Sequence, residues 1–177
     1  MDNRLSEITA RIRNVPDFPK PGILFKDVTP LIGHGPSFHT CIDLLAEQVE
    51  RTFRPLPDVL VGIESRGFIF GAALADRLSR GFVPVRKPGK LPYKTTRESY
   101  ALEYGTDALE MHEDAVTDLR SVVVDDLLAT GGTASATARL VERCGGKVAG
   151  FAFVIELGFL PGRSKLGDRP VEALIRY

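Results

Sequence analysis

The fold of this chain is organised around one stretch of sequence, Val122-Val123-Val124-Asp125-Asp126-Leu127-Leu128-Ala129-Thr130-Gly131-Gly132-Thr133. Three β-branched residues in a row, bounded by polar residues, predict a buried strand of a parallel sheet. Two adjacent carboxylates end this strand, a Thr-Gly-Gly-Thr turn follows, and the pattern from Ala134 to Cys144 predicts a helix. The stretch therefore predicts a strand, a tight polar turn and the N-terminus of a helix.

The predicted turn has the properties of an anion-binding site. Backbone N–H groups at the start of a helix lack intrahelical partners, and the helix dipole favours negative charge beside them. Gly131 and Gly132 can adopt positive φ angles and allow an anion to approach the backbone closely. Thr130 and Thr133 add hydroxyl donors, and Thr133 can also cap the helix. We therefore expect a phosphate group at this turn.

Asp125 and Asp126 make the prediction more specific, because a phosphate repels carboxylates and these two need another partner. They can accept hydrogen bonds from a ribose diol, or lie near a Mg²⁺ ion that a pyrophosphate carries. The alternative is purely structural: one aspartate caps the turn and the other is solvated. The sequence around the pair decides between the two, as described below.

Size and composition are typical of a globular protein. The 177 residues suit one domain with a substantial core, with or without a small flap. The 23 basic and 23 acidic residues balance to a net charge of zero, so we expect no nucleic-acid partner. The sequence has no apolar run of about 18 residues and no signal-peptide core. We therefore expect no membrane partner and a cytoplasmic location.

Cysteine and histidine residues do not indicate a metal site. Cys41 and Cys144 lie in helical apolar patterns without a neighbouring ligand at metal spacing, so we expect buried, reduced thiols. The histidines are scattered through the sequence, at His34, His39 and His112.

The N-terminal part combines a short helix with an irregular segment. Leu5, Ile8 and Ile12 are spaced for one helix face, and Pro16 is expected to end that helix. The segment from Val15 to Pro30 is rich in proline, which disfavours a helix or central strand, and we expect an ordered loop. The apolar spacing from Phe38 to Phe53 then predicts an amphipathic helix entered through Pro36.

The middle of the chain alternates strands and helices. Residues 59–63 predict a buried strand, Glu64-Ser65-Arg66-Gly67 a second polar turn, residues 68–80 a helix and residues 82–86 another strand. This alternation implies a parallel sheet with right-handed crossovers, whose ligands bind beyond the carboxyl ends of the strands. Because both polar turns lie at such ends, we expect Arg66 and Asp125 to border one crevice.

The segment between these two units predicts a loop and a hairpin. Residues 86–94 are basic and contain two prolines, which indicates a mobile loop or, alternatively, a solvated connector. Residues 100–104 and 108–111 alternate around Gly105-Thr106-Asp107, which predicts an antiparallel hairpin. After the phosphate-binding unit we expect a strand over 147–155, a loop over 156–170 and a terminal strand over 171–177.

The aspartate pair followed by Ala-Thr-Gly-Gly-Thr resembles the phosphoribosyl-pyrophosphate (PRPP) motif of the type I phosphoribosyltransferases. The chain resembles the adenine phosphoribosyltransferase family almost from end to end. Five matching segments occur in the expected order: Asp17–Asp27, Ser65–Phe68, Arg86–Pro92, Ser99–Gly105 and Val123–Thr133. Chance similarity does not produce five collinear matches of this kind.

The resemblance implies an α/β fold, the type I phosphoribosyltransferase fold, with a central parallel sheet flanked by helices. It implies a single domain over residues 1–177, with an N-terminal hood and base-binding segment over 1–35 and a flexible β-hairpin lid over 87–111. The implied activity is transfer of 5-phosphoribose from PRPP to N9 of adenine, which forms AMP and pyrophosphate in purine salvage. Enzymes of this family use Mg²⁺, are cytosolic and are usually homodimers.

The resemblance also implies roles for individual residues. The residues implied to be catalytic are Glu103 and Arg66, and Glu103 is implied to handle the proton of the base. The residues implied to bind PRPP are Asp125, Asp126, Ala129, Thr130, Gly131, Gly132, Thr133, Glu64, Ser65, Arg86, Lys87 and Lys90. The residues implied to bind adenine are Leu24, Phe25 and Lys26, with Phe25 stacking on the purine. No metal ligand falls to the protein itself, because PRPP, pyrophosphate and water hold most of the Mg²⁺ coordination.

Lys26 departs from the family pattern, in which many relatives carry arginine. The change is harmless if this position acts through its backbone, whereas a planar stacking role would be weakened. Two other functions stay open at this point: phosphoribosyl transfer to another purine or pyrimidine, and nucleotide sensing by a regulator that keeps the fold. A regulator usually needs a DNA-binding segment or a basic surface, and this neutral chain shows neither.

Overall fold

The predicted central strand is longer than expected. In the computed structural model, which describes residues 3–101 and 106–177, it runs as β7 over Arg120–Leu128. Val122, Val123 and Val124 are fully buried, as predicted. Asp125 and Asp126 lie within the strand instead of after it, because the ladder with β8 continues to the pairing of Leu128 with Glu156. The backbone that carries both carboxylates is therefore fixed within the sheet, near the carboxyl end of the strand.

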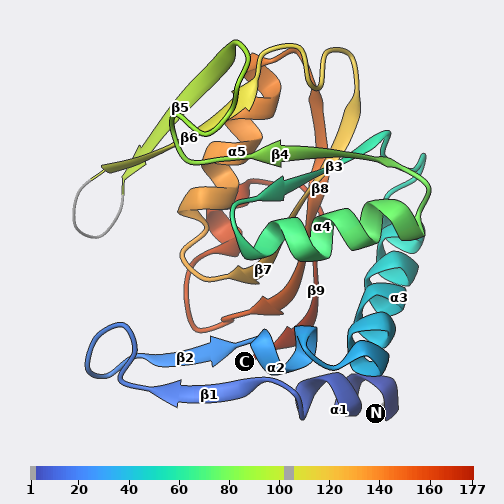
Figure 1. The fold of residues 1–177 in the computed structure, drawn as a ribbon, viewed down its shortest axis with the longest axis vertical. Coiled ribbons are helices and arrows are strands. Elements are labelled where there is room, and N and C mark those ends of the chain that lie inside the picture. Colours follow the sequence, from blue (N-terminus) through green and yellow to red (C-terminus); the bar gives the residue numbers. More distant parts are fainter. Residues whose placement is uncertain (1–2, 102–105) are drawn as a thin grey trace. The chain divides into compact units, whose positions relative to one another are not determined.

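β7 is the middle strand of a parallel sheet of five strands in the order β4-β3-β7-β8-β9 (Figure 1). Its other members are β3 (Val59–Ile63), β4 (Gly81–Val85), β8 (Lys147–Glu156) and β9 (Val171–Arg176). All four neighbouring pairs are parallel. The predicted α/β class and parallel sheet are confirmed.

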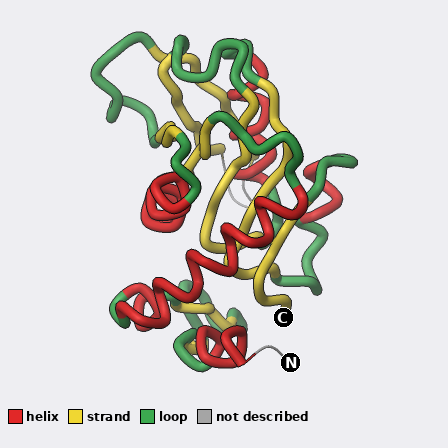
Figure 2. The backbone as a smooth tube through the Cα atoms, turned by 90° about the vertical axis from the view of Figure 1, so that its right-hand side faces the viewer, coloured by secondary structure: helices red, strands yellow, loops and turns green. Residues whose placement is uncertain are grey.

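Two crossover helices cover opposite faces of this sheet. α4 (Arg66–Arg77) connects β3 to β4 on one side, and α5 (Gly132–Arg143) connects β7 to β8 on the other. Right-handed crossovers in opposite directions place their helices on opposite faces, as Figures 1 and 2 show. The direction changes between β3 and β7. That boundary is the switch point at which sheets of this type bind ligands.

An antiparallel hairpin packs beside α5. It consists of β5 (Thr95–Ala101) and β6 (Thr106–His112), so its first strand begins five residues earlier than predicted. Thr106 and Asp107 belong to β6 and not to the turn, because Tyr100 pairs with Asp107 and Ala101 with Thr106. Glu103, predicted to lie in the first strand, and Gly105, predicted to lie in the turn, are outside the described part of the chain. Leu109 and Met111 are fully buried in the main hydrophobic core.

Ion pairs also fix the base of the hairpin. Glu98 on β5 accepts hydrogen bonds from Arg139 at 2.6 Å and from Arg143 at 2.9 Å, both on α5. The pKa of Glu98 is lowered, chiefly by the bond from Arg139. The hairpin is therefore tied to α5, the helix that follows the glycine turn at residues 129–132.

The chain divides into two compact units, residues 1–44 and 45–177, and the sheet and hairpin described above belong to the second. The first unit contains α1 (Asn3–Thr9), β1 (Arg13–Pro16), β2 (Leu24–Asp27), α2 (Thr29–Ile32) and the start of α3 (Gly35–Thr52). The helix predicted from Phe38 to Phe53 is confirmed as α3. The single-domain organisation stays a prediction.

The loop predicted for residues 15–30 is wrong, because much of this segment is regular. β1 and β2 form an antiparallel two-stranded sheet, with Pro16 opposite Leu24 and Asn14 opposite Lys26. Proline is tolerated there because Pro16 ends its strand, where a missing N–H removes little from the ladder. The first helix ends at Thr9 and not at Pro16, since β1 occupies the intervening residues.

Both cysteines are buried and free, as predicted. Burial raises the pKa of the Cys41 thiol to about 12, so it stays protonated and unreactive at neutral pH. Within the part of the chain that the structure describes, no helix is long and apolar enough to cross a membrane.

Candidate active site

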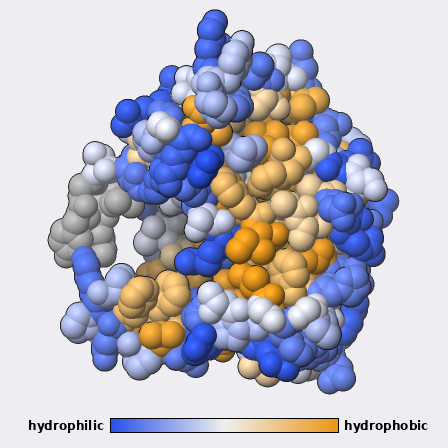
Figure 3. All heavy atoms as spheres, in the orientation of Figure 1, coloured by the Kyte–Doolittle hydropathy of each residue, from blue (hydrophilic) through white to orange (hydrophobic). Residues whose placement is uncertain are grey.

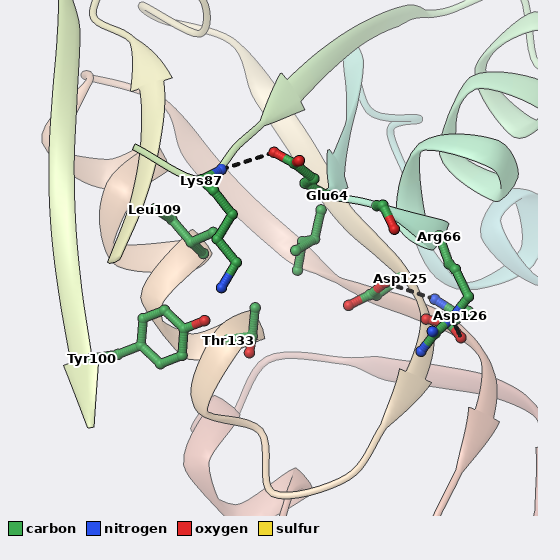
Figure 4. Close-up of a pocket in the computed structure, with 10 residues that line it drawn as sticks. Glu64, Arg66, Lys87, Tyr100, Leu109, Asp125, Asp126 and Thr133 are labelled. Atoms are coloured by element: carbon green, nitrogen blue, oxygen red, sulfur yellow. Dashed lines mark hydrogen bonds and ion pairs between the residues drawn. The ribbon is translucent and has the colours of Figure 1, made fainter. Parts of the chain in front are cut away.

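A cavity of about 260 Å³ opens at the switch point between β3 and β7 (Figure 4). Its lining comes from the ends of both strands, from the first turns of α4 and α5, from the loop after β4 and from the hairpin. The residues are Ile63, Glu64, Ser65, Arg66, Lys87, Tyr100, Leu109, Asp125, Asp126 and Thr133. The expectation that Arg66 and Asp125 border one crevice is confirmed. The lining is rich in charge of both signs, which suits a polar, ionic ligand.

The turn over residues 129–133, predicted to bind phosphate, forms a second hollow of about 210 Å³, which is lined by Asp125 and by residues 127–134. Gly131 has φ +75°, as predicted for a turn that opens toward a ligand, whereas Gly132 is already the first residue of α5. The proposed cap by Thr133 is wrong, since the N-cap position is Gly131 and Thr133 lies inside the helix. The first N–H groups of α5 therefore stay available to an anion.

The two aspartates differ in their surroundings. Asp126 is only 3% exposed and accepts a hydrogen bond from Arg66 Nε at 2.5 Å. Asp125 accepts the backbone N–H of Asp126 at 2.9 Å. Burial and the neighbouring charge of Asp126 raise the pKa of Asp125, and Arg66 offsets only part of this. Asp126 is thus matched by a cation, and the carboxylate of Asp125 points into the cavity (Figure 4).

Gly67, for which the sequence predicted no role, allows α4 to pack against the end of β7 beside Asp125. A Cβ atom at this position would lie 2.8 Å from Asp125 Oδ1 and 2.8 Å from the carbonyl oxygen of Val124. Only glycine lets the first turn of α4 pack this closely on the end of β7. The glycine after Arg66 was visible in the sequence, but the close approach that requires it depends on two distant segments meeting.

Glu64 binds the basic residues around it, and its own negative charge makes it unsuitable as a ligand for an anion. Its carboxylate accepts hydrogen bonds from Lys90 Nζ at 2.6 Å, the Lys87 backbone N–H at 2.9 Å and Arg86 Nε at 3.2 Å. Burial alone would raise the pKa of Glu64, but these three donors outweigh it and hold the pKa at about 2. The peptide bond between Glu64 and Ser65 is cis.

Lys87 reaches the cavity from the opposite wall. Its ammonium group pairs with Asp107, which also accepts a hydrogen bond from the Tyr100 hydroxyl at 3.2 Å. Tyr100 and Asp107 were not among the predicted site residues. The pairing of β5 with β6 places them opposite each other, and a sequence pattern that put Asp107 in the turn could not show this.

Glu64→Gln is expected to remove part of the acid sensitivity of the fold. The pKa of Glu64 lies at about 2, below its ordinary value of 4.5. Its ionised form therefore stabilises the fold fully above pH 4.5, and this stabilisation is lost as the pH falls toward 2. The melting temperatures of the two proteins should differ most above pH 4.5 and converge in acid. A difference that does not change with pH would contradict this role.

The three residues predicted to bind adenine lie together on β2, in the first unit. Leu24 is 49% exposed, and the ring of Phe25 meets the edge of Phe18 at 5.1 Å between centroids. Lys26 is buried, and its Nζ donates to Asn14 Oδ1 at 2.8 Å. The Lys26 side chain is thus engaged within the hairpin of β1 and β2.

Among the described residues, no group of three or more histidine, cysteine, aspartate or glutamate side chains is arranged to hold a metal ion. Asp125 and Asp126 still provide carboxylate oxygens at the cavity, and Mg²⁺ is commonly bound through one or two carboxylates together with substrate phosphates. The donor set therefore fits a metal ion that arrives with a phosphorylated substrate.

Comparison with known proteins identifies the family. Residues 32–168 match the phosphoribosyl transferase domain. An adenine phosphoribosyltransferase of Sorangium cellulosum is 58% identical over 173 residues, which cover 97% of this chain and 85% of that protein. This chain belongs to the adenine phosphoribosyltransferase family.

Solved structures of adenine phosphoribosyltransferases share the fold. The enzyme of Thermoanaerobacter pseudethanolicus is 52% identical, with a TM-score of 0.93 and coverage of 98% of this chain and 99% of that one. The enzyme of Saccharomyces cerevisiae, complexed with an imino-altritol bisphosphate and adenine, is 41% identical with a TM-score of 0.93, and covers 98% of this chain and 99% of that one. The type I phosphoribosyltransferase fold implied by the sequence is confirmed.

Proposed function

We propose that this chain transfers the 5-phosphoribosyl group of PRPP to N9 of adenine, forming AMP and pyrophosphate in purine salvage. One observation carries the proposal: a single cavity at the sheet switch point joins the aspartate pair to Arg66 and Lys87, beside a glycine turn at a helix N-terminus. A ribose between a 5′-phosphate and a pyrophosphate needs these three kinds of group. Membership of the adenine phosphoribosyltransferase family supports adenine as acceptor.

Each end of PRPP has a partner of matching chemistry. The turn of Ala129–Thr133 and the first N–H groups of α5 bind the 5′-phosphate. Asp125 and Asp126 accept hydrogen bonds from the ribose hydroxyls. Arg66, together with the basic residues Arg86, Lys87 and Lys90, binds the pyrophosphate, whose negative charge grows as the C1–O bond breaks. Glu64 positions Arg86 and Lys90 and orients the Lys87 backbone N–H for this task.

Bond breaking leaves a sugar with oxocarbenium character, as in glycoside hydrolysis, and water must be kept from it. We assign this exclusion to residues 87–111, as a lid that carries Glu103 to the base. Adenine must lose its N9 proton as the new bond forms. A carboxylate on the lid can accept that proton only when the lid is closed, which links proton transfer to the exclusion of water.

The reaction is expected to require Mg²⁺. Bound together with PRPP, the ion neutralises charge on the leaving pyrophosphate. Asp125 and Asp126 are the described residues that would face it. Asp126 is buried and bound to Arg66, and Asp125 accepts the backbone N–H of Asp126, so both carboxylates are held in place for the ribose hydroxyls.

The base is read by the backbone of β2. Pro16 has no N–H, so the pair of Pro16 with Leu24 cannot exchange both ladder hydrogen bonds, and its polar groups are expected to face outward. Residues alternate along a strand, so Leu24 and Lys26 present their backbone groups to the same outer edge. A carbonyl and an N–H in fixed order match the N6 donor and N1 acceptor of adenine. The Asn14 contact of Lys26 is consistent with a backbone role for that residue.

The chain is expected to prefer adenine strongly over hypoxanthine and guanine. Both 6-oxopurines carry a carbonyl at position 6 and a proton on N1, so they would face two mispaired groups on β2. Each mispaired buried group costs about 1–3 kcal/mol, which gives about 10²–10⁴-fold in kcat/KM. Pyrophosphate release from PRPP and Mg²⁺ with each free base measures the preference.

This assay also separates the proposal from its rivals. Comparable kcat/KM for adenine and hypoxanthine would assign a different phosphoribosyltransferase activity, and no release with any base would favour a nucleotide-sensing regulator. Lys26→Arg is the matched control, because a backbone role predicts an unchanged preference. Val15→Pro, which adds a second proline opposite β2, is expected to damage the preference.

We further infer a cytoplasmic homodimer, in line with the family. Hydrophobic side chains gather over α4 and β4 on the face drawn in Figure 3, and Ile69 of α4 is 41% exposed. Exposed apolar patches commonly mark protein interfaces. Light scattering on purified protein tests the assembly, and a monomer at micromolar concentration would overturn it.

A further inference from the structure

The loop after β8 contacts the turn over residues 129–133, although no sequence motif connects the two. A Cβ atom on Gly131 would overlap the carbonyl oxygen of Gly162 and lie 3.1 Å from its Cα. A Cβ atom on Gly162 would in turn overlap the carbonyl oxygen of Ala129 and lie 3.2 Å from Leu128 Cδ1. The backbone of Gly162 is therefore the wall against which the turn rests.

An ion pair fixes the position of this wall. Arg163, the next residue, donates from Nε to Glu156 Oε1 at 3.0 Å and from Nη2 to Oε2 at 2.6 Å. Its Nη1 donates to the carbonyl oxygen of Val171 at 2.8 Å, on the neighbouring strand β9. Two parallel bonds to one carboxylate set direction as well as distance.

Glu156 is itself rigidly placed. Its side chain is 5% exposed, and it ends β8 opposite Leu128, the last residue of β7. The N–H of Leu157 donates to the carbonyl oxygen of Leu128 at 2.9 Å. A continuous chain of contacts therefore surrounds the hollow at the turn. It runs from β7 through the turn to Gly162, and from there through the Arg163–Glu156 pair back to the end of β7.

We propose that Arg163 and Glu156 are positioning residues for the 5′-phosphate: through Gly162 they hold the Ala129–Thr133 turn in its binding geometry. The proposal rests on the proposed function, since it assigns the 5′-phosphate to this turn. Arg163 binds Glu156 and Val171 with its donors, so it acts on the ligand through the turn. A shift of the turn by about 1 Å would misalign the N–H donors and can cost about 10²-fold.

The test compares a ligand that has a 5′-phosphate with one that lacks it. Ribose 5-phosphate and pyrophosphate are titrated calorimetrically into wild type, Arg163→Gln, Arg163→Lys and Glu156→Gln. We expect Arg163→Gln and Glu156→Gln to weaken ribose 5-phosphate binding by about tenfold or more and to leave pyrophosphate binding unchanged. Arg163→Lys keeps the positive charge but cannot form both bonds to the Glu156 carboxylate, so its affinity for ribose 5-phosphate should lie between those of wild type and Arg163→Gln.

Arg169→Ala is the matched control. Arg169 lies in the same loop and pairs with Glu142 on α5, but it does not join the wall to the turn. It should keep wild-type affinity for both ligands. Gly162→Ala should give the same selective loss as Arg163→Gln, and far-UV circular dichroism with a melting curve shows whether each variant is folded.

A folded Arg163→Gln protein with unchanged ribose 5-phosphate affinity would overturn the proposal. So would equal losses for ribose 5-phosphate and pyrophosphate, which would indicate a general loss of structure. The activity itself is judged separately on wild type: binding of ribose 5-phosphate without AMP formation would reject adenine transfer and leave the positioning role standing.

Discussion

Asp125→Asn is expected to lower kcat/KM for PRPP by about one to two orders of magnitude while leaving the melting temperature unchanged or higher. The loss follows from charge-assisted hydrogen bonds to the ribose, worth about 1.5–3 kcal/mol. The stability follows from the raised pKa of Asp125. Because the pKa of Asp125 is higher in the folded state than its ordinary value of 3.8, the fold loses stability as the pH rises from 3.8 through the folded value, and asparagine removes this loss.

Asp126→Asn should give the opposite stability result. Asp126 is 3% exposed and is matched by Arg66, so the variant loses a cation partner and should melt at a lower temperature. It should also weaken PRPP binding, because Arg66 loses the contact that orients it. Calorimetric titration with PRPP and Mg²⁺, together with thermal melts at pH 7, measures both effects. Unchanged affinity and turnover in both variants would reduce the pair to a purely structural role in β7.

The sequence predicted well wherever one segment carries its own pattern. The run Val122–Val124 is typical of a strand that is buried on both faces of a parallel sheet, and Gly131 can provide a positive φ regardless of what surrounds it. The polar turns at the ends of β3 and β7 then had to meet, because parallel neighbours end at the same edge. The crevice between Arg66 and Asp125 follows from these local facts.

Features that depend on two distant segments could not be predicted in this way. The hairpin of β1 and β2 pairs a proline-rich strand with residues that resemble a loop, and its stability comes from the pairing. Glu64 was expected to bind PRPP, but its role depends on donors 22 to 26 residues away. The contact of Gly162 with the phosphate-binding turn depends on a loop whose sequence contains no motif.

Glu103→Gln is expected to reduce kcat by about 10²–10⁴-fold and to change adenine affinity little. Glu103 lies outside the described residues, so the expectation rests on its match to the family's catalytic acid. Glutamine keeps the size and the hydrogen bonding of the side chain but cannot accept the N9 proton. Single-turnover measurements with saturating PRPP separate the chemical step from product release. The kcat of the variant should also lose the acid limb that a carboxylate base gives to the pH profile.

Glu113→Gln is the control, because Glu113 follows β6, is exposed and does not line the cavity. It should show wild-type turnover. The split between kcat and KM distinguishes the two roles that a lid carboxylate can have. A base that accepts the proton affects the transition state alone, whereas a residue that only orients adenine affects the KM for adenine. Wild-type turnover in Glu103→Gln would remove the proton-transfer role, and a loss confined to the KM would leave Glu103 as a residue that holds the base beneath the closed lid.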